Sequence, residues 1–467
     1  MDSYTSSYSQ FHVILFPFMS KGHTIPILHL AHLLLRRRSS IAITIFTTPA
    51  NHSFIADSLA GTSSRIVILN FPKNIPQVPS GIESTDKLPS MTLFPSFALA
   101  TKLMQPEFED ALESLQQVNF MVSDGFLWWT LESATKYGFP RLVFYGMSNY
   151  SVSLSRAIRE DMLRLKLESD EELITVTRFP WIKVSRSEFK STVPQDELQL
   201  EFMVKAITAS KSSYGYIVNS IYELEPVFVD YFNDQGGPMA WCVGPLCLAK
   251  PSMAESVFHE KPTWNQWLDK KLERESSVLY VAFGSQVEIS EDQLKEIAIG
   301  LEKSQVNFLW VIRKKEIELS DGFDFEERVK DRGIIVRDWV NQREIIQHKS
   351  IKGFLSHCGW NSVLESICAG VPILAWPMMA EQPFNAKMVV EEIKVGLRVH
   401  TCDGSVEGFV KREVLEKKVK GLMEGEKGKE VRKKAKEYAE MAKKAMEEGT
   451  GSSWRTLDKL IDETWRK

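Results

Sequence analysis

The chain has few cysteines and no long apolar run, and these two absences exclude several classes of protein. Its 467 residues include five scattered cysteines, at positions 242, 247, 358, 368 and 402, and no C-x-x-C pair. An odd number of dispersed cysteines is neither a disulfide framework nor a zinc site. No stretch reaches the roughly 18 apolar residues needed to span a bilayer. The first ten residues hold no Lys or Arg, so we expect no secretory signal. Together these features predict a cytoplasmic protein with reduced thiols and no stable membrane insertion.

Neither sign of charge is in large surplus, and three familiar motifs are missing. The 57 basic and 61 acidic residues leave a net charge of −4, whereas a nucleic-acid binder would carry a basic surplus. The first loop lacks the G-x-G-x-x-G of a nicotinamide oxidoreductase, and there is no Walker A sequence. No D-x-D occurs either, so the usual carboxylate anchor for a metal on a sugar nucleotide is absent. We therefore expect no nucleic acid, no metal and no bound cofactor.

Short apolar runs alternate with amphipathic stretches along the chain, which is typical of an α/β fold with parallel strands. In the first half, the FHVILF run at 11–16 predicts a strand, and a helix follows from about His23 to Arg38. The second half repeats the pattern from the VLYVAF run at 278–283. Further strands are expected at 41–46, 119–123, 141–145, 308–312, 334–336, 353–355 and 371–376. Ser290 with Gln293 predicts a capping box that opens a helix.

The amino-acid composition changes between the two halves of the chain. Residues 247–262 hold two prolines, small residues and mixed charge, which is typical of an interdomain linker. We therefore expect an N-terminal domain over 1–246 and a C-terminal domain over 263–450. A final helix over 451–467 is expected to pack back on the N-terminal domain. The Lys- and Glu-rich residues 407–448 are interpreted as solvated amphipathic helices. In doubly wound sheets ligands bind at the carboxyl ends of the strands, so the functional residues should directly follow strands.

The segment from Trp339 to Gln382 carries the strongest chemical signal. At its centre, residues 356–362 read SHCGWNS, a turn between a predicted strand and a predicted helix. A helix N-terminus presents free N–H groups and a positive dipole end, which bind phosphate. His357 can donate to a phosphate oxygen, and Gly359 allows close approach of the backbone. Glu365 lies one turn into the helix, where a carboxylate can accept from two ribose hydroxyls.

This 44-residue box resembles the signature of plant UDP-dependent secondary-product glycosyltransferases. The resemblance extends over the chain through residues 17–26, Asp124, 244–245 and 278–285. It implies the GT-B architecture, in which two Rossmann-like doubly wound parallel-sheet domains face a cleft. It also implies transfer of a sugar from a UDP-sugar, as co-substrate, to a small lipophilic acceptor. The donor-binding residues that it implies are Ser285, Trp339, Val340, Gln342, His357, Trp360, Asn361, Ser362, Glu365, Glu381 and Gln382.

Two positions of the box bear on the donor sugar. In this family Gln382, the last residue of the box, is associated with glucose, whereas His is associated with galactose. Trp360 stands where glucuronosyl members tend to have an Arg, which a carboxylate donor would need. The resemblance therefore implies UDP-glucose. Glu381 stands where many members have Asp, and its longer side chain can still accept from sugar hydroxyls.

His23 and Asp124 are the candidate catalytic residues. A His at the start of a helix is often structural, and an Asp after a strand is often a helix N-cap. The family, however, places its catalytic base in the Gly22-His23 element and its partner at Asp124. We expect the helix N-terminus to keep His23 neutral, as a general base needs. The resemblance then implies a single inverting displacement, in which His23 takes the proton of the acceptor hydroxyl.

The acceptor is left open by the sequence. Aromatic, Met and polar side chains on post-strand loops are candidates for its site, with core packing as the alternative: Phe18, Met19, Phe126, Trp128, Met147 and Asn149. Flavonoids, other phenolics, terpenoids and hormones all remain possible. Two alternatives remain for the function. One is the same reaction with another UDP-sugar, and the other is a protein that binds a UDP-sugar without catalysis, although such a protein would be expected to lack His23 or Asp124. A monomer is the default expectation.

Overall fold

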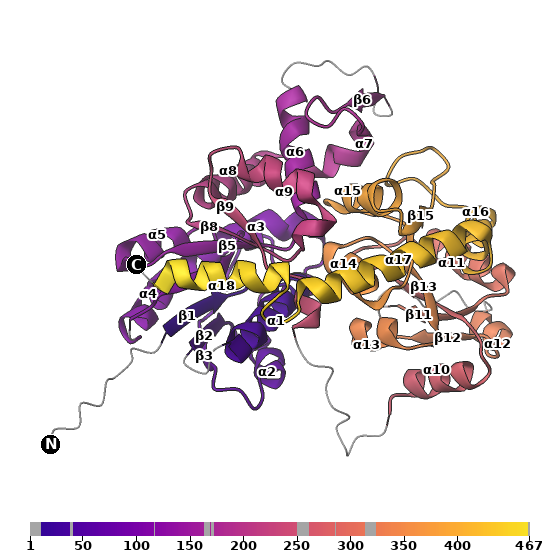
Figure 1. The fold of residues 1–467 in the computed structure, drawn as a ribbon, viewed down its shortest axis with the longest axis horizontal. Helices are drawn as coiled ribbons and strands as arrows, with labels where there is room; N and C mark the ends of the chain where they lie inside the picture. Colours follow the sequence, from indigo (N-terminus) through magenta and orange to yellow (C-terminus); the bar gives the residue numbers. More distant parts are fainter. Residues whose placement is uncertain are drawn as a thin grey trace.

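The computed structural model describes residues 11–37, 41–115, 117–162, 169, 172–249, 261–284, 286–312 and 324–465. Two parallel β-sheets lie side by side, each with helices on both faces (Figure 1). A small antiparallel pair, β6 (Leu173–Thr175) and β7 (Lys183–Ser185), lies outside them. The expected pair of doubly wound α/β domains is confirmed.

The N-terminal sheet has seven parallel strands in the order β3-β2-β1-β4-β5-β8-β9. Their bounds are β1 Phe11–Phe16, β2 Ile41–Thr47, β3 Arg65–Ile68, β4 Phe120–Asp124, β5 Arg141–Tyr145, β8 Gly215–Val218 and β9 Met239–Cys242. The flanking helices are α1 Lys21–Arg37, α2 Pro49–Ser58, α3 Phe94–Ala100, α4 Gln105–Glu113, α5 Thr130–Tyr137, α6 Asn149–Met162, α7 Arg186–Phe189, α8 Glu197–Lys211 and α9 Pro226–Asn233. The strand order reverses between β1 and β4, so the loops after these two strands diverge and leave a crevice.

The C-terminal sheet has six parallel strands in the order β12-β11-β10-β13-β14-β15 and reverses between β10 and β13. Its strands are β10 Val278–Ala282, β11 Asn307–Val311, β12 Gly333–Val336, β13 Ile351–Ser356, β14 Ile373–Ala375 and β15 Gly396–Arg398. The helices are α10 Thr263–Glu273, α11 Glu291–Ser304, α12 Phe325–Val329, α13 Gln342–Gln347, α14 Trp360–Ala369, α15 Gln382–Lys387, α16 Arg412–Met423 and α17 Glu426–Ala445.

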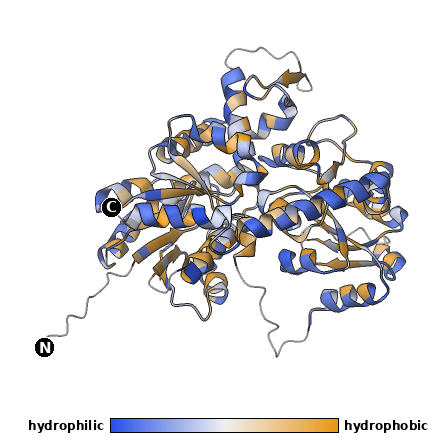
Figure 2. Ribbon diagram, in the orientation of Figure 1, coloured by the Kyte–Doolittle hydropathy of each residue, from blue (hydrophilic) through white to orange (hydrophobic). Residues whose placement is uncertain are grey.

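The central strands are buried along their whole length, which explains why they read as continuous apolar runs. All residues of β1 and β10 are buried, as expected for parallel strands covered on both faces. Figure 2 shows apolar residues concentrated in the two sheets and polar residues on the outer faces of the helices. Each predicted strand matches an observed one to within two residues at either end.

Ser290 caps α11 as expected. The second contact of the predicted capping box, from the Gln293 side chain back to the start of the helix, is wrong. The Ser290 side chain accepts from the Gln293 backbone N–H. The Gln293 side chain, however, is turned to Val410, where it both donates to the carbonyl (2.9 Å) and accepts from the N–H (2.8 Å). A tertiary contact to the segment before α16 has therefore replaced the local one.

The last helix, α18 (Ser452–Trp465), lies across the N-terminal sheet, whereas α17 lies on the C-terminal domain (Figure 1). Leu457, Leu460 and Ile461 of α18 belong to the same buried cluster as β1 and α1. The Arg37 guanidinium stacks on Trp454 at 3.4 Å and pairs with Asp458. Helix α18 thus packs on the domain that contains β1 and α1. The proposed domain boundaries at 246 and 263 stay predictions, and residues 250–260 of the expected linker lie outside the described residues.

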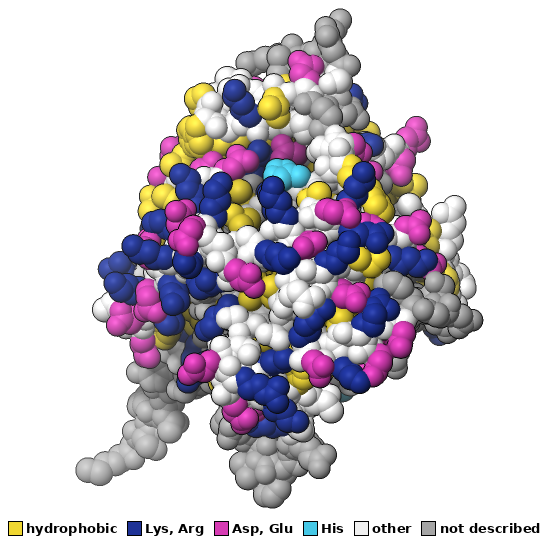
Figure 3. All heavy atoms as spheres, turned by 90° about the vertical axis from the view of Figure 1, so that its right-hand side faces the viewer, with side chains coloured by type: hydrophobic (Ala, Val, Ile, Leu, Met, Phe, Trp, Pro, Cys, Tyr) yellow, Lys and Arg dark blue, Asp and Glu magenta, His cyan; other side chains and the backbone are white. Residues whose placement is uncertain are grey.

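The surface over the C-terminal domain mixes the two signs of charge. Lys, Arg, Asp and Glu side chains are interspersed on the face seen in Figure 3. Along α17, Val431 and four alanines form the buried stripe, as the periodicity predicts, and ion pairs such as Lys434–Glu437 lie on its outer side. Across the described residues, every helix is too short or too polar to cross a membrane.

Candidate active site

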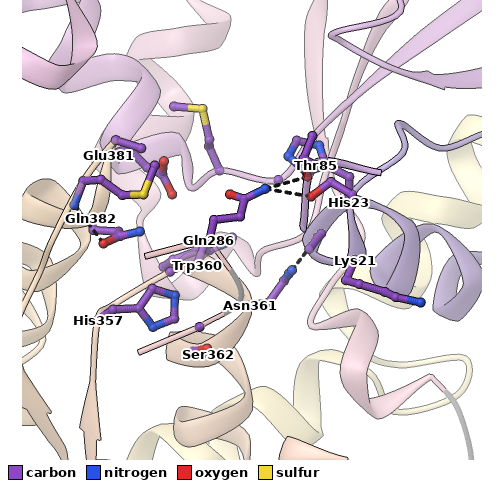
Figure 4. A pocket seen from close by; sticks show the side chains of 18 of the residues that line it. Lys21, His23, Thr85, Gln286, His357, Trp360, Asn361, Ser362, Glu381 and Gln382 are labelled. Atoms are coloured by element: carbon purple, nitrogen blue, oxygen red, sulfur yellow. Dashed lines mark hydrogen bonds between the residues drawn. The ribbon is translucent and has the colours of Figure 1, made fainter. Parts of the chain in front are cut away.

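Each sheet has a point at which its strand order reverses, and these two points face one another across a deep cleft. Its volume is about 3390 Å³, several times that of a typical pocket for one small ligand. One wall comes from the loops after β1, β4 and β5, and the other from the loops after β10, β13 and β14. Figure 4 shows His23, Thr85 and Lys21 on one side and His357, Gln382 and Glu381 on the other. The cleft can therefore hold two substrates together.

His23 and Asp124 meet at the reversal of the N-terminal sheet. His23 lies in the first turn of α1, and Asp124 ends β4. The Nδ1–H of His23 donates to Asp124 Oδ2 at 2.7 Å. Because the carboxylate accepts at Nδ1, the other ring nitrogen, Nε2, is left as the proton acceptor. The His23 side chain is 22% exposed and that of Asp124 is 0% exposed, so the imidazole can be reached from the cleft while its partner is shielded.

The turn after β4 holds Asp124 in place. Its Oδ1 accepts from the Phe126 backbone N–H at 2.9 Å. Helix α5 begins only at Thr130, with Trp129 at its N-cap, so Asp124 is not the cap of that helix. Beneath the turn, the buried Arg141 guanidinium donates to the Asp124 carbonyl at 3.2 Å and to the Ser123 hydroxyl at 2.7 Å. Burial lowers the pKa of Arg141 to about 10, so it stays a cation beneath the carboxylate at neutral pH.

The electrostatic surroundings of His23 differ from the sequence-based expectation. Burial lowers the pKa of His23, but the Asp124 carboxylate and, more weakly, Glu381 outweigh it and raise the pKa above its ordinary 6.5. The net shift is therefore opposite in direction to the one expected from the helix N-terminus alone, because the nearby carboxylates outweigh the effects that lower the pKa. Asp124 makes His23 a stronger base at the cost of a higher pH for deprotonation.

On the opposite wall, two glycines enclose the His357 ring at the N-terminus of α14. A Cβ on Gly284 or on Gly359 would lie only 2.6 Å from His357 Nε2. Gly284 also has φ +81°, a conformation that favours glycine. The backbone therefore contacts the ring from two sides and holds it at the first turn of the helix, where N–H groups are free. Ser285, the next predicted donor residue, lies outside the described residues.

A hydrogen-bonded chain runs along the α13 side of this wall. The Gln342 amide donates to Ser362 Oγ (2.8 Å) and to Glu365 Oε2 (2.7 Å). Burial raises the pKa of Glu365 to about 7, although Gln342 and Arg343 oppose the shift. The second carboxylate oxygen of Glu365 takes part in neither bond. This wall therefore presents a carboxylate that ionises near neutral pH.

Asn361 and Trp360 are engaged in contacts between the domains. The Asn361 amide donates to the Gly22 carbonyl at 2.6 Å, one residue before His23. The Trp360 indole N–H donates to the Asn219 carbonyl at 2.8 Å, and its ring is 2% exposed. Asn219 also donates to Asn361 at 3.4 Å. The first turn of α14 is thus joined directly to the element that carries His23.

The remaining predicted donor residues line the same cleft. Trp339 and Val340 precede α13, and the Trp339 side chain is 68% exposed. Glu381 stands at the N-cap position of α15, and burial raises its pKa. The Gln382 carbonyl accepts from the backbone N–H groups of Met378 and Met379 at 3.0 and 3.1 Å, which directs its amide nitrogen elsewhere. Figure 4 shows Glu381 and Gln382 beside His357.

Gln286 crosses the cleft, a contact that sequence reasoning did not identify. Its amide donates to Thr85 Oγ1 at 2.7 Å and to Ser20 Oγ at 3.2 Å. Both bonds appear as dashed lines in Figure 4. Gln286 follows β10, whereas Ser20 and Thr85 belong to the N-terminal domain, so no local pattern in the sequence joins them.

Beyond His23, an aromatic wall forms the other end of the cleft. The Phe126 ring lies 5.0 Å from the His23 ring, centroid to centroid, and 5.3 Å from Phe94 and from Phe202. Phe18 and Met147 also line the cleft. Phe94 and Phe202, on α3 and α8, were missed by the sequence because helical periodicity shows which face is buried but not which helices meet.

Three candidate acceptor residues do not line the cleft. Met19 is buried in the core of the N-terminal domain. Trp128 lies on that core's periphery, with Lys102 and Lys205 over its ring. Asn149 is buried, and both its backbone and side-chain N–H groups donate to Glu225 at 3.1 Å. Core packing, the alternative interpretation of these residues, explains all three positions.

No group of three or more His, Cys, Asp or Glu side chains within the described ranges is arranged to hold a metal ion. The polar side chains that line the cleft include amides, imidazoles, hydroxyls, carboxylates and the cations of Lys and Arg. What this arrangement can do is bind a phosphorylated nucleoside on one wall and present a base to a second molecule on the other.

Comparison with known proteins identifies the family. Residues 260–426 match the family described as "UDP-glucoronosyl and UDP-glucosyl transferase". UDP-glycosyltransferase 90A1 of Arabidopsis thaliana is 56% identical over 97% of this chain and 96% of its own length. Glycyrrhiza uralensis UGT73P12, complexed with glycyrrhetinic acid 3-O-monoglucuronide, is 31% identical over 98% of this chain and 96% of that one, with a TM-score of 0.85.

A second solved structure of the same fold holds two bound molecules together. Phytolacca americana UGT2, complexed with UDP-2fluoro-glucose and pterostilbene, is 25% identical over 97% of this chain and 100% of that one, with a TM-score of 0.80. Sequence identity over nearly the full length and the shared two-domain architecture lead to one conclusion. The chain belongs to the plant UDP-glycosyltransferase family and has its GT-B fold.

Proposed function

We propose that this protein transfers glucose from UDP-glucose, with inversion, to a hydroxyl of a small lipophilic phenolic or terpenoid. The observation that carries the proposal is the placement of His23 and Asp124 directly across the cleft from the N-terminus of α14. A base and its partner thereby face a phosphate-binding element, with room for two substrates between them.

In the proposed reaction, His23 Nε2 takes the proton of the acceptor hydroxyl as its oxygen attacks the anomeric carbon. The bond from that carbon to the UDP oxygen breaks, and UDP leaves with the bonding electron pair. The 2.7 Å contact to Asp124 orients the imidazole and stabilises the imidazolium that forms. Attack opposite the leaving group inverts the anomeric centre, so an α-linked donor gives a β-glucoside.

The departing UDP is the group whose charge must be stabilised. The free N–H groups at the start of α14 and the His357 ring, enclosed by Gly284 and Gly359, are preorganised for this purpose. Trp339 offers an exposed ring for the uracil, and Glu365 a carboxylate for the ribose hydroxyls. Because these groups can stabilise the diphosphate, and the sequence has no D-x-D, we propose that the reaction needs no metal.

Glucose is proposed from the residues around the sugar position. Gln382 has its carbonyl bonded to two backbone N–H groups, so its amide nitrogen can donate to a sugar hydroxyl. Glu381, beside it, can accept from one. No Arg stands at position 360 to pair with the carboxylate of a glucuronosyl donor. The Phytolacca relative's complex with UDP-2fluoro-glucose supports the same choice.

The acceptor class is proposed from the aromatic wall beside His23. Phe94, Phe126 and Phe202 pack edge to face at 5.3 Å and present apolar surface to the cleft. Flat aromatic or fused-ring molecules fit such a surface. Relatives bind pterostilbene in the Phytolacca structure and glycyrrhetinic acid 3-O-monoglucuronide in the Glycyrrhiza structure.

The test is turnover of UDP-glucose with a panel of flavonoids, simple phenols and terpenoids in the presence of EDTA. We expect a product heavier by one hexose, with the anomeric coupling of a β-linkage in proton NMR. Faster turnover with UDP-galactose, UDP-glucuronic acid or UDP-rhamnose would overturn the proposed donor. Tight UDP binding without turnover for any acceptor would favour the non-catalytic alternative, and loss of turnover in EDTA would overturn metal independence.

A further inference from the structure

A buried guanidinium lies beneath the turn that carries Asp124. Arg141 is the first residue of β5 and is 1% exposed. Within the described residues its hydrogen bonds all go to neutral oxygens: Ser123 Oγ (2.7 Å), Thr130 Oγ1 (2.9 Å), Ser213 Oγ (2.8 Å) and the carbonyls of Asp124 (3.2 Å) and Leu127 (3.4 Å). None of the described carboxylates lies within ion-pair distance of it, although a buried cation is costly without an anion nearby.

The hydrogen bonds of Arg141 hold both ends of the turn after β4. Its Nε donates to Ser123 and to Thr130, whose hydroxyls lie 2.8 Å apart. Its Nη2 donates to the carbonyls of Asp124 and Leu127 between them, and the Leu127 N–H donates to the Asp124 carbonyl at 3.1 Å. A planar guanidinium with five donors suits such a set of acceptors, which an ammonium cannot match. One side chain therefore holds the backbone around Asp124.

Asp124 is the one anion among the described groups that act electrostatically on Arg141. The others are Tyr145, on the same strand, and Tyr216, on β8. Burial raises the pKa of both tyrosines, so both phenols are neutral near pH 7. Burial lowers the pKa of Arg141 only to about 10, so the guanidinium is charged there. At neutral pH, one cation therefore faces one anion in this part of the domain.

The charge balance around Asp124 changes when His23 takes a proton. While His23 is neutral, Arg141 is the positive charge beneath the buried Asp124 carboxylate. Once protonated, His23 is a second cation beside Asp124, and Glu381 is the other anion that acts on it. A fixed positive charge favours the ionised carboxylate in the first state and opposes the imidazolium in the second.

We propose that Arg141 is a positioning residue of the transfer reaction, which holds the turn that directs Asp124 and balances the charge of its carboxylate. Its guanidinium is buried, so it acts through Asp124 rather than on a substrate. This inference rests on the proposed function, since it takes His23 as the base and Asp124 as its partner. Holding the turn and balancing the charge have different effects on the pH profile, so the two roles can be measured separately.

The charge is tested by kcat/KM–pH profiles of the parent and of Arg141→Met. Without the cation, the Asp124 carboxylate takes a proton more readily and the His23 imidazolium is opposed less. Both effects should move the acidic limb to higher pH, by about 0.5 to 1 unit. If Arg141 only held the turn, its loss would loosen the contact between Asp124 and His23 and move the limb to lower pH. A limb that moves down or stays in place would overturn the proposal.

Arg141→Gln guards against a variant that does not fold. It loses the charge but keeps an amide donor, and it should show the same upward shift of the limb. UDP affinity, measured by calorimetry, reports whether each variant is folded, because the proposed donor wall lies in the other domain. It should stay within about twofold of the parent.

Arg141→Lys tests the hydrogen bonds, because it keeps the charge but not the planar fork. The acidic limb should stay within about 0.2 unit of that of the parent. The kcat should fall about tenfold, because the turn that orients the base is no longer held in place. An unchanged kcat in Arg141→Lys would overturn the positioning role.

Lys271→Met is the matched control for the loss of a buried cation. Lys271 is 6% exposed and also donates to neutral oxygens, Asn307 Oδ1 at 2.8 Å and the Asp331 carbonyl at 2.7 Å, in the C-terminal domain. Its loss should leave the limb and kcat unchanged, and a shift equal to that of Arg141→Met would overturn the proposal.

His23→Ala distinguishes failure of this inference from failure of the proposed function. If turnover is lost in His23→Ala while the Arg141 variants match the parent, only the role of Arg141 fails. If turnover survives in His23→Ala, the proposed base itself fails.

Discussion

Two side chains, His23 and Asp124, determine how the reaction should depend on pH. Asp124 raises the pKa of His23 above 6.5 against the opposing effect of burial. The base works only when neutral, so kcat/KM should fall as the pH drops through a value above 6.5. The Asp124→Asn variant loses the carboxylate that raises the His23 pKa, while burial still lowers that pKa. The acidic limb of the kcat/KM–pH profile should therefore move to lower pH. The maximal rate should fall about 10²-fold or more, because the imidazolium loses its partner.

A pH series of kcat/KM for the parent and for Asp124→Asn measures both effects. Asp458→Asn is a matched control, because that carboxylate pairs with Arg37 on α18 rather than with His23. It should leave the acid limb where it is. An unshifted limb in Asp124→Asn would contradict the assignment of His23 as the titrating base.

Glu365 predicts a second pH effect, on binding alone. Burial raises its pKa to about 7, and ribose hydroxyls that donate to it favour the ionised form. The affinity for uridine should therefore be full above pH 7 and weaken as the pH falls below it, by at most about tenfold per unit. Uridine is the probe because it lacks titrating phosphates. Calorimetry from pH 6 to 8 checks this, and Glu365→Gln should bind weakly and show no such trend.

At the scale of elements, the loop after β10 should tolerate no side chain at Gly284. With φ +81° and a Cβ position 2.6 Å from His357 Nε2, Gly284→Ala should both strain the backbone, by about 1–2 kcal/mol, and displace His357. Gly61 has φ +79°, and a Cβ built there has no neighbouring atom within 4 Å. Gly61→Ala therefore causes the backbone strain without a steric clash. Urea unfolding should show a loss for both variants, but UDP affinity should fall only in Gly284→Ala.

The elements that the sequence predicted well are those whose signal is local. Buried parallel strands such as β1 and β10 need apolar residues on both faces, and the Gly370 that ends α14 has φ +67°. The antiparallel pair β6 and β7 was not predicted, because it is three residues long in each strand and only partly buried. Nothing in the sequences of helices α3 and α8 indicates that their phenylalanines meet beside His23.

At the scale of the whole molecule, the predictable part of the site is the part that lies within one segment. Residues 339–382 hold most of the proposed donor-binding residues in one continuous stretch, so these residues could be named from the sequence. The Asn361–Gly22 bond joins residues 339 positions apart, and Gln286 reaches Thr85 over 201 positions. Such contacts depend on how the domains are placed, which no local pattern records. Met19, Trp128 and Asn149 were misplaced for a different reason: their contacts lie inside the N-terminal domain, and a position on a loop after a strand does not show which way a side chain points.

The return of α18 to the N-terminal domain predicts that stability depends on the last turns of the chain. Leu460 is fully buried in the cluster that includes β1 and α1. Leu460→Ala should lower the free energy of unfolding by about 2–5 kcal/mol, measured by urea denaturation. Arg455, exposed on the same helix, offers the control: Arg455→Ala should change it by less than about 0.5 kcal/mol. Equal effects of the two variants would contradict the packing of α18.

The central claim is that His23 is the base of a glucosyl transfer across the cleft. It is tested most directly by UDP release from UDP-glucose, with an accepted phenol or terpenoid, for the parent chain and His23→Ala. The account predicts turnover by the parent and a loss of about 10²-fold or more in the variant, with UDP affinity unchanged within about twofold. Undiminished turnover in His23→Ala would contradict it, because another group would then be taking the proton.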